Sequence, residues 1–310
     1  MTLLLFLLAL AGGFFLLAKG SDYFVDGAAG IAGKFGIPQI IIALTIVAMG
    51  TSAPEAAVSI AAAFQGNADI SIGNVIGSNI MNICIILGLC AVITPLAVKR
   101  STVRYEMPFL IFVSLVLLLL GLDGNVGRIN GIILIVLFII YLGYLFAEAK
   151  NGREQQTEDE KQKNIGLLLL FLVGGLAAVV IGSKLAVYGA TGLAEAFGLS
   201  ERFIGLTIVA LGTSLPELFT CVAAAKKGND DIAIGTIVGS NIFNILFVIG
   251  LTSLITNVPY QSKFIIDGLV MIAIVIFLWI CVLVRKKLTR TAGICLLVLY
   301  AAYFVYLLKG

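Results

Sequence analysis

Two stretches of this chain are almost alike: FGIPQIIIALTIVAMGTSAPE at residues 35–55 and FGLSERFIGLTIVALGTSLPE at residues 197–217. Each leads into a second matching segment, GNADISIGNVIGSNIMNI at 66–83 and GNDDIAIGTIVGSNIFNI at 228–245. The matched positions keep one offset of 162 residues without a gap. Self-similarity of this length indicates an internal duplication, so the chain is predicted to contain the same structural unit twice.

The composition places the chain in a membrane. Its 310 residues are 60% hydrophobic and only 12% charged, with a mean hydropathy of +1.12. A soluble domain carries roughly 45–50% apolar and about 25% charged residues. These values exclude a soluble enzyme, a secreted disulfide scaffold and a nucleic-acid-binding protein. The chain has no histidine, and its five cysteines lie inside apolar runs, where we expect them to pack as small side chains.

Crossing the hydrocarbon takes about 20 mostly apolar residues in a helix. Ten stretches meet this requirement, at residues 2–18, 38–64, 70–95, 107–122, 129–147, 165–187, 200–225, 231–256, 264–284 and 291–308. The predicted fold is therefore an all-α integral membrane protein of ten transmembrane helices. The duplication divides it into an N-terminal five-helix repeat (1–147), a polar linker (148–164) and a C-terminal five-helix repeat (165–310).

An odd number of helices in each repeat makes the second repeat enter the membrane from the opposite side. Cytoplasmic loops accumulate Lys and Arg, and most of the 20 basic residues fall on one side if the N-terminus lies outside. We therefore predict a multi-pass cell-membrane protein with extracellular termini and a cytoplasmic 148–164 linker. Inverted repeats with interrupted helices are typical of secondary transporters that bind substrates near the middle of the membrane.

Two glutamates lie deep inside apolar runs at matching positions of the repeats, Glu55 and Glu217. An ionised side chain at the centre of the bilayer costs at least about 2.5–3.5 kcal/mol on insertion scales. A single such residue could be incidental, whereas a pair related by the duplication indicates a functional site.

The residues before each glutamate add further oxygen atoms. In GTSAPE (50–55) and GTSLPE (212–217), proline removes a backbone donor and frees the carbonyl four residues earlier. Such irregular backbone survives at membrane depth only where it faces protein or a watery cavity. Hydroxyls three and four residues before a glutamate share its helix face. They belong to Thr51 and Ser52 in the first repeat and to Thr213 and Ser214 in the second.

The GSNIxN segments at 77–82 and 239–244 supply the second element of the site. A serine and an asparagine four positions apart lie on one helix face, and we predict that this face turns toward the glutamates. The side chains concerned are Ser78, Asn82, Ser240 and Asn244. Asn79 and Asn241 point elsewhere, and the sequence leaves open whether they are ligands or contacts between helices.

A cluster of carboxylate, hydroxyl, amide and carbonyl oxygens suits hard cations. Ca²⁺ takes 6–8 oxygen ligands at about 2.3–2.6 Å in tolerant geometry, whereas Mg²⁺ demands a stricter octahedron. Na⁺ uses the same donors as Ca²⁺. Two carboxylates are neutralised by one Ca²⁺ or by two Na⁺, so the cations should compete for one site, and competition is the basis of exchange. No Walker-type glycine loop is present, so no ATP coupling is expected.

GTSxPE followed by GSNIxN, present twice, resembles the α-repeats of the cation/Ca²⁺ exchanger superfamily, and within it the prokaryotic Na⁺/Ca²⁺ exchangers. The likeness covers essentially the whole chain. It implies that Glu55 and Glu217 bind both Ca²⁺ and Na⁺, together with the hydroxyls and amides above and the backbone carbonyls of Ala48 and Ala210. It further implies alternating access by sliding of the first and sixth helices. These helices carry small surfaces at Gly12, Gly13, Gly20, Gly174, Gly175 and Gly182.

The amides are one departure from the family pattern. Na⁺/Ca²⁺ exchangers commonly have an aspartate at one of the positions of Asn82 and Asn244, so this site carries two formal charges instead of three. A third Na⁺ would therefore leave the loaded site with a net positive charge. Proton-coupled relatives usually read GNxxE where this chain reads GTSxPE, which favours Na⁺ as the coupling ion.

The sequence thus predicts an antiporter, not an enzyme, that exchanges Na⁺ for Ca²⁺ by alternating access. We expect a monomer with no cofactor, whose partners are the two ions and the lipid bilayer. The nearest alternative is a Ca²⁺/H⁺ antiporter in which the same glutamates are protonated in exchange for Ca²⁺. A cation channel and an intramembrane hydrolase have less support, because the chain lacks a carbonyl-filter motif and histidine and carries every candidate residue twice.

Overall fold

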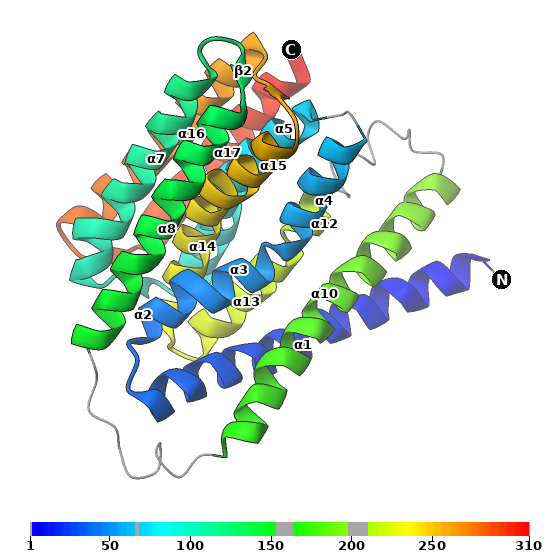
Figure 1. The fold of residues 1–310 in the computed structure, drawn as a ribbon. Helices are drawn as coiled ribbons and strands as arrows, with labels where there is room; N and C mark the ends of the chain where they lie inside the picture. Colours follow the sequence, from blue (N-terminus) through cyan, green and yellow to red (C-terminus); the bar gives the residue numbers. More distant parts are fainter. Residues whose placement is uncertain (1, 66–67, 153–163, 198–209, 310) are drawn as a thin grey trace.

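The structure, a computed structural model, describes residues 2–65, 68–152, 164–197 and 210–309. This part of the chain is almost entirely helical, as Figure 1 shows, which confirms the all-α class. Eight helices in it are long and apolar enough to cross a membrane, and the bent pair Gln39–Thr51 and Ala53–Phe64 makes a ninth if it is one span. The first part of the predicted stretch 200–225 and most of the predicted linker lie outside the described residues.

The elements of both halves follow one order. The first half contains α1 (Thr2–Phe35), α2 (Gln39–Ile42), the π-helical turn η1 (Ala43–Val47), α3 (Ala48–Thr51), α4 (Ala53–Phe64), α5 (Asp69–Met81), η2 (Asn82–Leu87), α6 (Gly88–Ile93), β1 (Leu96–Ala97), η3 (Thr102–Glu106), α7 (Met107–Gly121), β2 (Asn125–Val126) and α8 (Arg128–Asn151). The second contains α10 (Ile165–Ala196), α12 (Ala210–Thr213), α13 (Leu215–Lys226), α14 (Asp230–Phe243), η5 (Asn244–Ile249), α15 (Gly250–Ile255), β3 (Val258–Pro259), α16 (Ser262–Leu283), β4 (Lys287–Leu288) and α17 (Arg290–Lys309).

The first and sixth helices are longer than the apolar stretches predicted. α1 has 34 residues and α10 has 32, which corresponds to roughly 50 Å at 1.5 Å per residue. The hydrocarbon core is only about 30 Å thick, so these helices must tilt or extend beyond it. Lys227 contacts two of the acidic residues in the longer, polar part of α1. Its Nζ lies 2.7 Å from Asp26 Oδ1 and donates to the Asp22 carbonyl at 2.7 Å.

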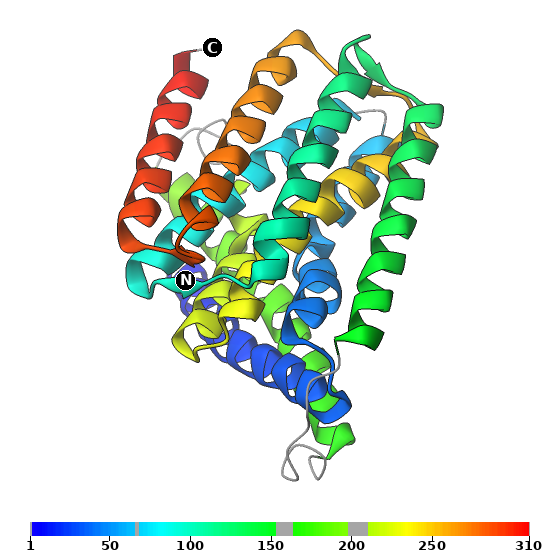
Figure 2. The same cartoon turned by 90° about the vertical axis from the view of Figure 1, so that its left-hand side faces the viewer.

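Two short strand pairs tie the halves together. β1 pairs antiparallel with β4, and β2 pairs antiparallel with β3. Because α7 runs from β1 to β2 while α16 runs from β3 to β4, the two pairings make these helices antiparallel. The helices α7, α8, α16 and α17 stand side by side on one face, as Figure 2 shows. α14 and η5 are almost wholly buried inside the bundle.

α1 and α10 cross each other at the side of the bundle (Figure 1). Glycines let their backbones touch at this crossing. A Cβ at Gly175 would lie 2.5 Å from the Phe24 nitrogen, and a Cβ at Gly182 would lie 2.8 Å from the Gly13 carbonyl oxygen. Gly174 does not contribute to the contact between α1 and α10, since a Cβ there would meet only a Leu170 side-chain carbon at 4.0 Å. Four of the six predicted glycines, Gly13, Gly20, Gly175 and Gly182, thus form the contact between the two helices.

Gly182→Val should destabilise the protein because the new side chain meets backbone, which cannot rotate away. Overpacking typically costs about 1–3 kcal/mol, and we expect a clear fall in the midpoint of thermal unfolding in detergent. Gly174→Val is the matched control, since it makes the same exchange on the same helix without a clash. Equal midpoints for the two variants would contradict the close crossing.

Candidate ion-binding site

Each GTSxPE motif breaks its helix in the middle of the fold. α3 ends at Thr51 and α4 begins at Ala53, with a bend of 48° between the two parts of the span. The break comes at Ser52, whose φ and ψ are −83° and 6°, and the second copy breaks at Ser214 with −89° and 2°. Proline at the start of the next helix explains both breaks, because it cannot donate to the preceding turn. Each glutamate therefore lies in the first turn of a half-helix.

The two glutamates are buried and each is bound by the opposite repeat. Glu55 is 1% exposed and Glu217 is fully buried. Ser52 donates to Glu217 Oε1 at 2.8 Å, and Ser214 donates to Glu55 Oε1 at 3.5 Å. The structure thus brings together the two carboxylates and both predicted serines. Because each serine binds the glutamate of the other repeat, the breaks in the two helices lie next to each other in the structure.

The remaining predicted hydroxyls lie around the carboxylates. Thr51 and Ser240 face Glu217, and Thr213 faces Glu55. Ser240 also donates to the Ala48 carbonyl at 3.3 Å, so this predicted backbone ligand borders the site. Ser78 lies on α5, one turn before Asn82, and is buried. Ala210 is the first residue of α12 and lies one turn before the break at Ser214.

The asparagines form a reciprocal network between α5 and α14. Asn79 donates to the Asn241 carbonyl and Asn241 donates to the Asn79 carbonyl, both at 3.1 Å. Their side-chain oxygens then accept hydrogen bonds from the amides of the predicted ligands. Asn82 donates to Asn241 Oδ1 at 2.9 Å, and Asn244 donates to Asn79 Oδ1 at 3.2 Å. The question left open by the sequence is thereby settled: Asn79 and Asn241 are contacts between helices.

This network has a consequence for the chemistry of the site. With their amide nitrogens occupied, Asn82 and Asn244 each keep a buried Oδ1 that has no hydrogen-bond partner among the described residues. Glu55 and Glu217 likewise keep a buried Oε2 without a partner. Buried polar atoms normally find partners, so four unpaired acceptor oxygens on four predicted ligands indicate a bound species that offers them positive charge or hydrogen-bond donors. A hard cation is such a species.

Asn74 is a supporting residue that the sequence analysis missed. It lies on α5, where its amide donates to the Glu55 carbonyl at 3.2 Å and to the Ser59 hydroxyl at 3.0 Å. It therefore fixes the half-helix that carries Glu55. The spacing of Asn74, Ser78 and Asn82 could have revealed it, because residues four apart share one helix face.

Thr51→Ala and Thr213→Ala should each weaken cation binding without abolishing it. Each change removes one neutral oxygen, a contact worth about 0.5–1.5 kcal/mol, which corresponds to roughly a twofold to tenfold loss of affinity. Isothermal titration with Na⁺ and with Ca²⁺ measures this directly. Unchanged affinities in both variants would remove the threonines from the ligand set.

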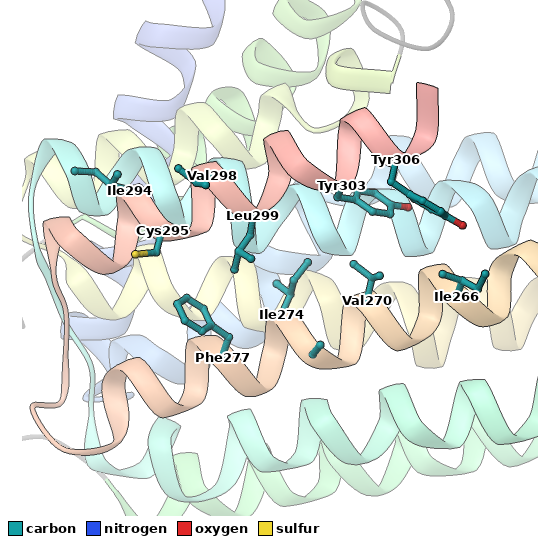
Figure 3. A pocket seen from close by; sticks show the side chains of 11 residues that line it. Ile266, Val270, Ile274, Phe277, Ile294, Cys295, Val298, Leu299, Tyr303 and Tyr306 are labelled. Carbon is teal, nitrogen blue, oxygen red and sulfur yellow. The ribbon is translucent and has the colours of Figure 1, made fainter. Parts of the chain in front are cut away.

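Two cavities near the membrane-facing surface differ in character. One of about 510 Å³ borders the break in the second repeat and is lined by residues that include Pro54, Ser183, Gly212 and Thr213. The other, of about 740 Å³, lies between α16 and α17. Figure 3 shows that apolar and aromatic side chains line it. The first cavity adjoins the site, whereas the second contains none of its residues.

A buried pair of carboxylates surrounded by hydroxyl and amide oxygens, inside a bundle of membrane-length helices, defines a cation-binding membrane protein. The family model described as sodium/calcium exchanger protein matches the chain twice, at residues 5–147 and 167–309. The chain belongs to the sodium/calcium exchanger family.

Relatives cover nearly the full length of this chain. It is 39% identical to the putative antiporter CaxA of Alkalimonas amylolytica, over 96% of each chain. It is 38% identical to the sodium/calcium exchanger MaX1 of Methanosarcina acetivorans, over 97% of this chain and 98% of the relative. Among solved structures, the sodium-calcium exchanger NCX_Mj soaked with zero Na⁺ and Ca²⁺ matches with a TM-score of 0.88 and 34% identity, over 98% of this chain and 99% of that one.

Proposed function

We propose that this protein exchanges Na⁺ for Ca²⁺ across the cell membrane, and that both ions bind between Glu55 and Glu217. The observation that carries the proposal is the set of four buried oxygens without partners, one on each of Glu55, Glu217, Asn82 and Asn244. Two carboxylates match one Ca²⁺ or two Na⁺ in charge, so either load leaves the site neutral. The name of MaX1 and the description of NCX_Mj, both sodium/calcium exchangers, support the same pair of ions.

Alternating access requires the site to face each side of the membrane in turn. We propose that the chain achieves this as ten helices in two inverted repeats, 1–147 and 165–310, joined by the linker 148–164. The antiparallel course of α7 and α16 supports the inversion, as do the crossed contacts from Ser52 to Glu217 and from Ser214 to Glu55. The close glycine crossing holds α1 and α10 against each other, so that the two helices can slide past the bundle as one pair.

The cavity beside Gly212 and Thr213 supplies a route to the site from one side. Its lining includes the part of α4 beyond the break and residues 180–188 of α10. We propose that this side is extracellular, with both termini outside and the linker in the cytoplasm, because this orientation puts most Lys and Arg residues inside. A monomer suffices, since one chain supplies all the proposed ligands.

The coupling ion is tested with purified protein in liposomes loaded with Na⁺. Diluting the liposomes into Na⁺-free medium at constant pH should drive uptake of ⁴⁵Ca²⁺, and collapsing the Na⁺ gradient should stop it. A pH gradient without Na⁺ should drive none. Uptake driven only by the pH gradient would instead establish Ca²⁺/H⁺ antiport at the same glutamates, and uptake insensitive to both gradients would indicate a channel.

A further inference from the structure

Glu106 is a third buried carboxylate, and the proposed exchange site does not use it. It is 1% exposed and ends the π-helical turn η3, directly before α7. An ionisable residue inside the membrane is costly and generally has a function. π-helical turns also occur preferentially at functional sites. Neither α7 nor α8, which face each other here, supplies any ligand of the exchange site.

Three buried polar side chains lie at this place, those of Glu106, Thr102 and Tyr141. Glu106 Oε2 and Tyr141 Oη have no hydrogen-bond partner among the described residues, and the Thr102 hydroxyl lies close enough to the Glu106 carboxylate to interact with it. Thr102 is the first residue of η3, and Tyr141 lies on α8. The other carboxylate oxygen, Oε1, accepts a hydrogen bond from the Tyr144 hydroxyl at 3.1 Å. The Tyr141 ring is held by stacking on Phe109, with ring centroids 5.0 Å apart. The Glu106 carboxylate and the Tyr141 hydroxyl are therefore held in place, and a carboxylate oxygen is a preferred ligand of hard cations.

A cavity of about 390 Å³ lies at this cluster, and its lining includes Glu106, Tyr141 and Tyr144. Arg104 also borders it, but its guanidinium stacks over the Tyr105 ring at 5.5 Å and forms no ion pair with Glu106 in the described part of the chain. Glu148, one turn beyond Tyr144 on α8, is close enough to interact electrostatically with Glu106. Within the described residues, no side chain forms an ion pair with the Glu106 carboxylate.

The second repeat contains the related arrangement with its own counter-charge. Tyr303 and Tyr306 occupy the positions that match Tyr141 and Tyr144, and Figure 3 shows both on α17. Tyr303 donates to Asp267 Oδ1 at 3.1 Å, and Lys263, one turn earlier on α16, interacts electrostatically with this carboxylate. None of the buried atoms without partners belongs to Asp267. Lys263, whose Nζ lies over the Phe264 ring at 5.1 Å, thus brings a positive charge near Asp267 without forming an ion pair with it in the described part of the chain.

We propose that Glu106, Thr102 and Tyr141 form a second cation site that takes one monovalent alkali ion. A single positive charge neutralises the single buried carboxylate. A divalent ion would leave an excess charge beside Arg104 in a medium of low dielectric constant, where such a charge is costly. The site lies apart from Glu55 and Glu217, so its ion is bound in addition to those exchanged.

The test uses the double variant Glu55→Gln/Glu217→Gln, which removes both carboxylates of the exchange site. A ligand that binds only the folded state stabilises it by RT ln(1 + [L]/Kd) and so raises the unfolding midpoint as its concentration rises above Kd. NaCl and KCl should each be titrated against choline chloride at equal ionic strength, while the unfolding midpoint in detergent is followed. We expect one of the alkali ions to raise the midpoint logarithmically with its concentration above Kd, relative to choline.

Further variants in that background locate the ion. Glu106→Gln should lower the alkali affinity at least about tenfold, and Tyr141→Phe should lower it several-fold, a loss of roughly 1 kcal/mol. Asp267→Asn is the matched control and should leave the affinity unchanged. Equal behaviour of choline, Na⁺ and K⁺ in the double variant would overturn the proposal and leave Glu106 as a protonated structural residue. Undiminished affinity in Glu106→Gln would overturn it as well. Neither result depends on which ion is exchanged at Glu55 and Glu217.

Discussion

Glu55→Gln should abolish Na⁺-driven Ca²⁺ uptake, and Glu217→Gln should do the same. Each change removes one of two charges that a Ca²⁺ ion needs in a site shielded from water, and it replaces an anionic oxygen by a neutral amide. Removing one partner of a buried, hydrogen-bonded charge pair costs about 3–5 kcal/mol, which corresponds to at least a hundredfold loss of Ca²⁺ affinity. The measurement is ⁴⁵Ca²⁺ uptake into Na⁺-loaded liposomes, together with titration of Ca²⁺ binding.

Both variants should still fold, because glutamine has the shape of glutamate and can accept the serine hydrogen bond from the opposite repeat. Size-exclusion chromatography and the unfolding midpoint check this point. Asp123→Asn is the control: it also neutralises a carboxylate, but in an exposed turn where Asp123 accepts a hydrogen bond from the Asn125 nitrogen. Normal exchange by either glutamine variant would refute the paired-carboxylate site.

Asn241→Ala should have the next largest effect, on both stability and ion binding. The side chain accepts from Asn82 and donates to the Asn79 carbonyl, and all of these groups are buried. Leaving buried partners unpaired costs about 1–3 kcal/mol. In addition, Asn82 would lose the contact that turns its oxygen toward the cations, so we expect Ca²⁺ affinity to fall about tenfold or more.

The symmetry of the network supplies an internal check. Asn79→Ala should reproduce the loss, because Asn79 makes the equivalent contacts to Asn244 and to the Asn241 carbonyl. Asn130→Ala is the control outside the network, since Asn130 makes only a long contact of 3.3 Å to the Leu120 carbonyl and one of 3.5 Å to the Asn125 carbonyl. A stable Asn241→Ala protein with unchanged Ca²⁺ affinity would show that the asparagine network does not orient the ligands.

Much of the site could be predicted because its determinants are local or repeated. The prolines after Ser52 and Ser214 dictate the helix breaks through the missing backbone donor, and this effect depends only on neighbouring residues. Glu55 and Glu217 stand out because a charge inside an apolar run is costly wherever the helix finally packs. The duplication then identifies the pair. Tertiary contacts were not needed for any of these steps.

Other features depended on contacts that helical periodicity does not encode. α1 continues past its apolar stretch, and Lys227, far away in the sequence, binds the acidic residues of this added part. Glu106 stands near the beginning of an apolar run and resembles a residue at a helix end, yet packing of α8 against η3 buries it.

The amino-acid sequence by itself determined the duplication, the broken helices and the two acidic residues that we propose as ligands, because these follow from residue spacing and from the cost of burying charge. Only the tertiary structure decided that each serine binds the glutamate of the other repeat, and that Asn79 and Asn241 hold Asn82 and Asn244 with one oxygen free. The physical reason is that hydrogen bonds are short and directional. Their partners are therefore fixed by how distant helices pack and not by the position of a residue along its own helix.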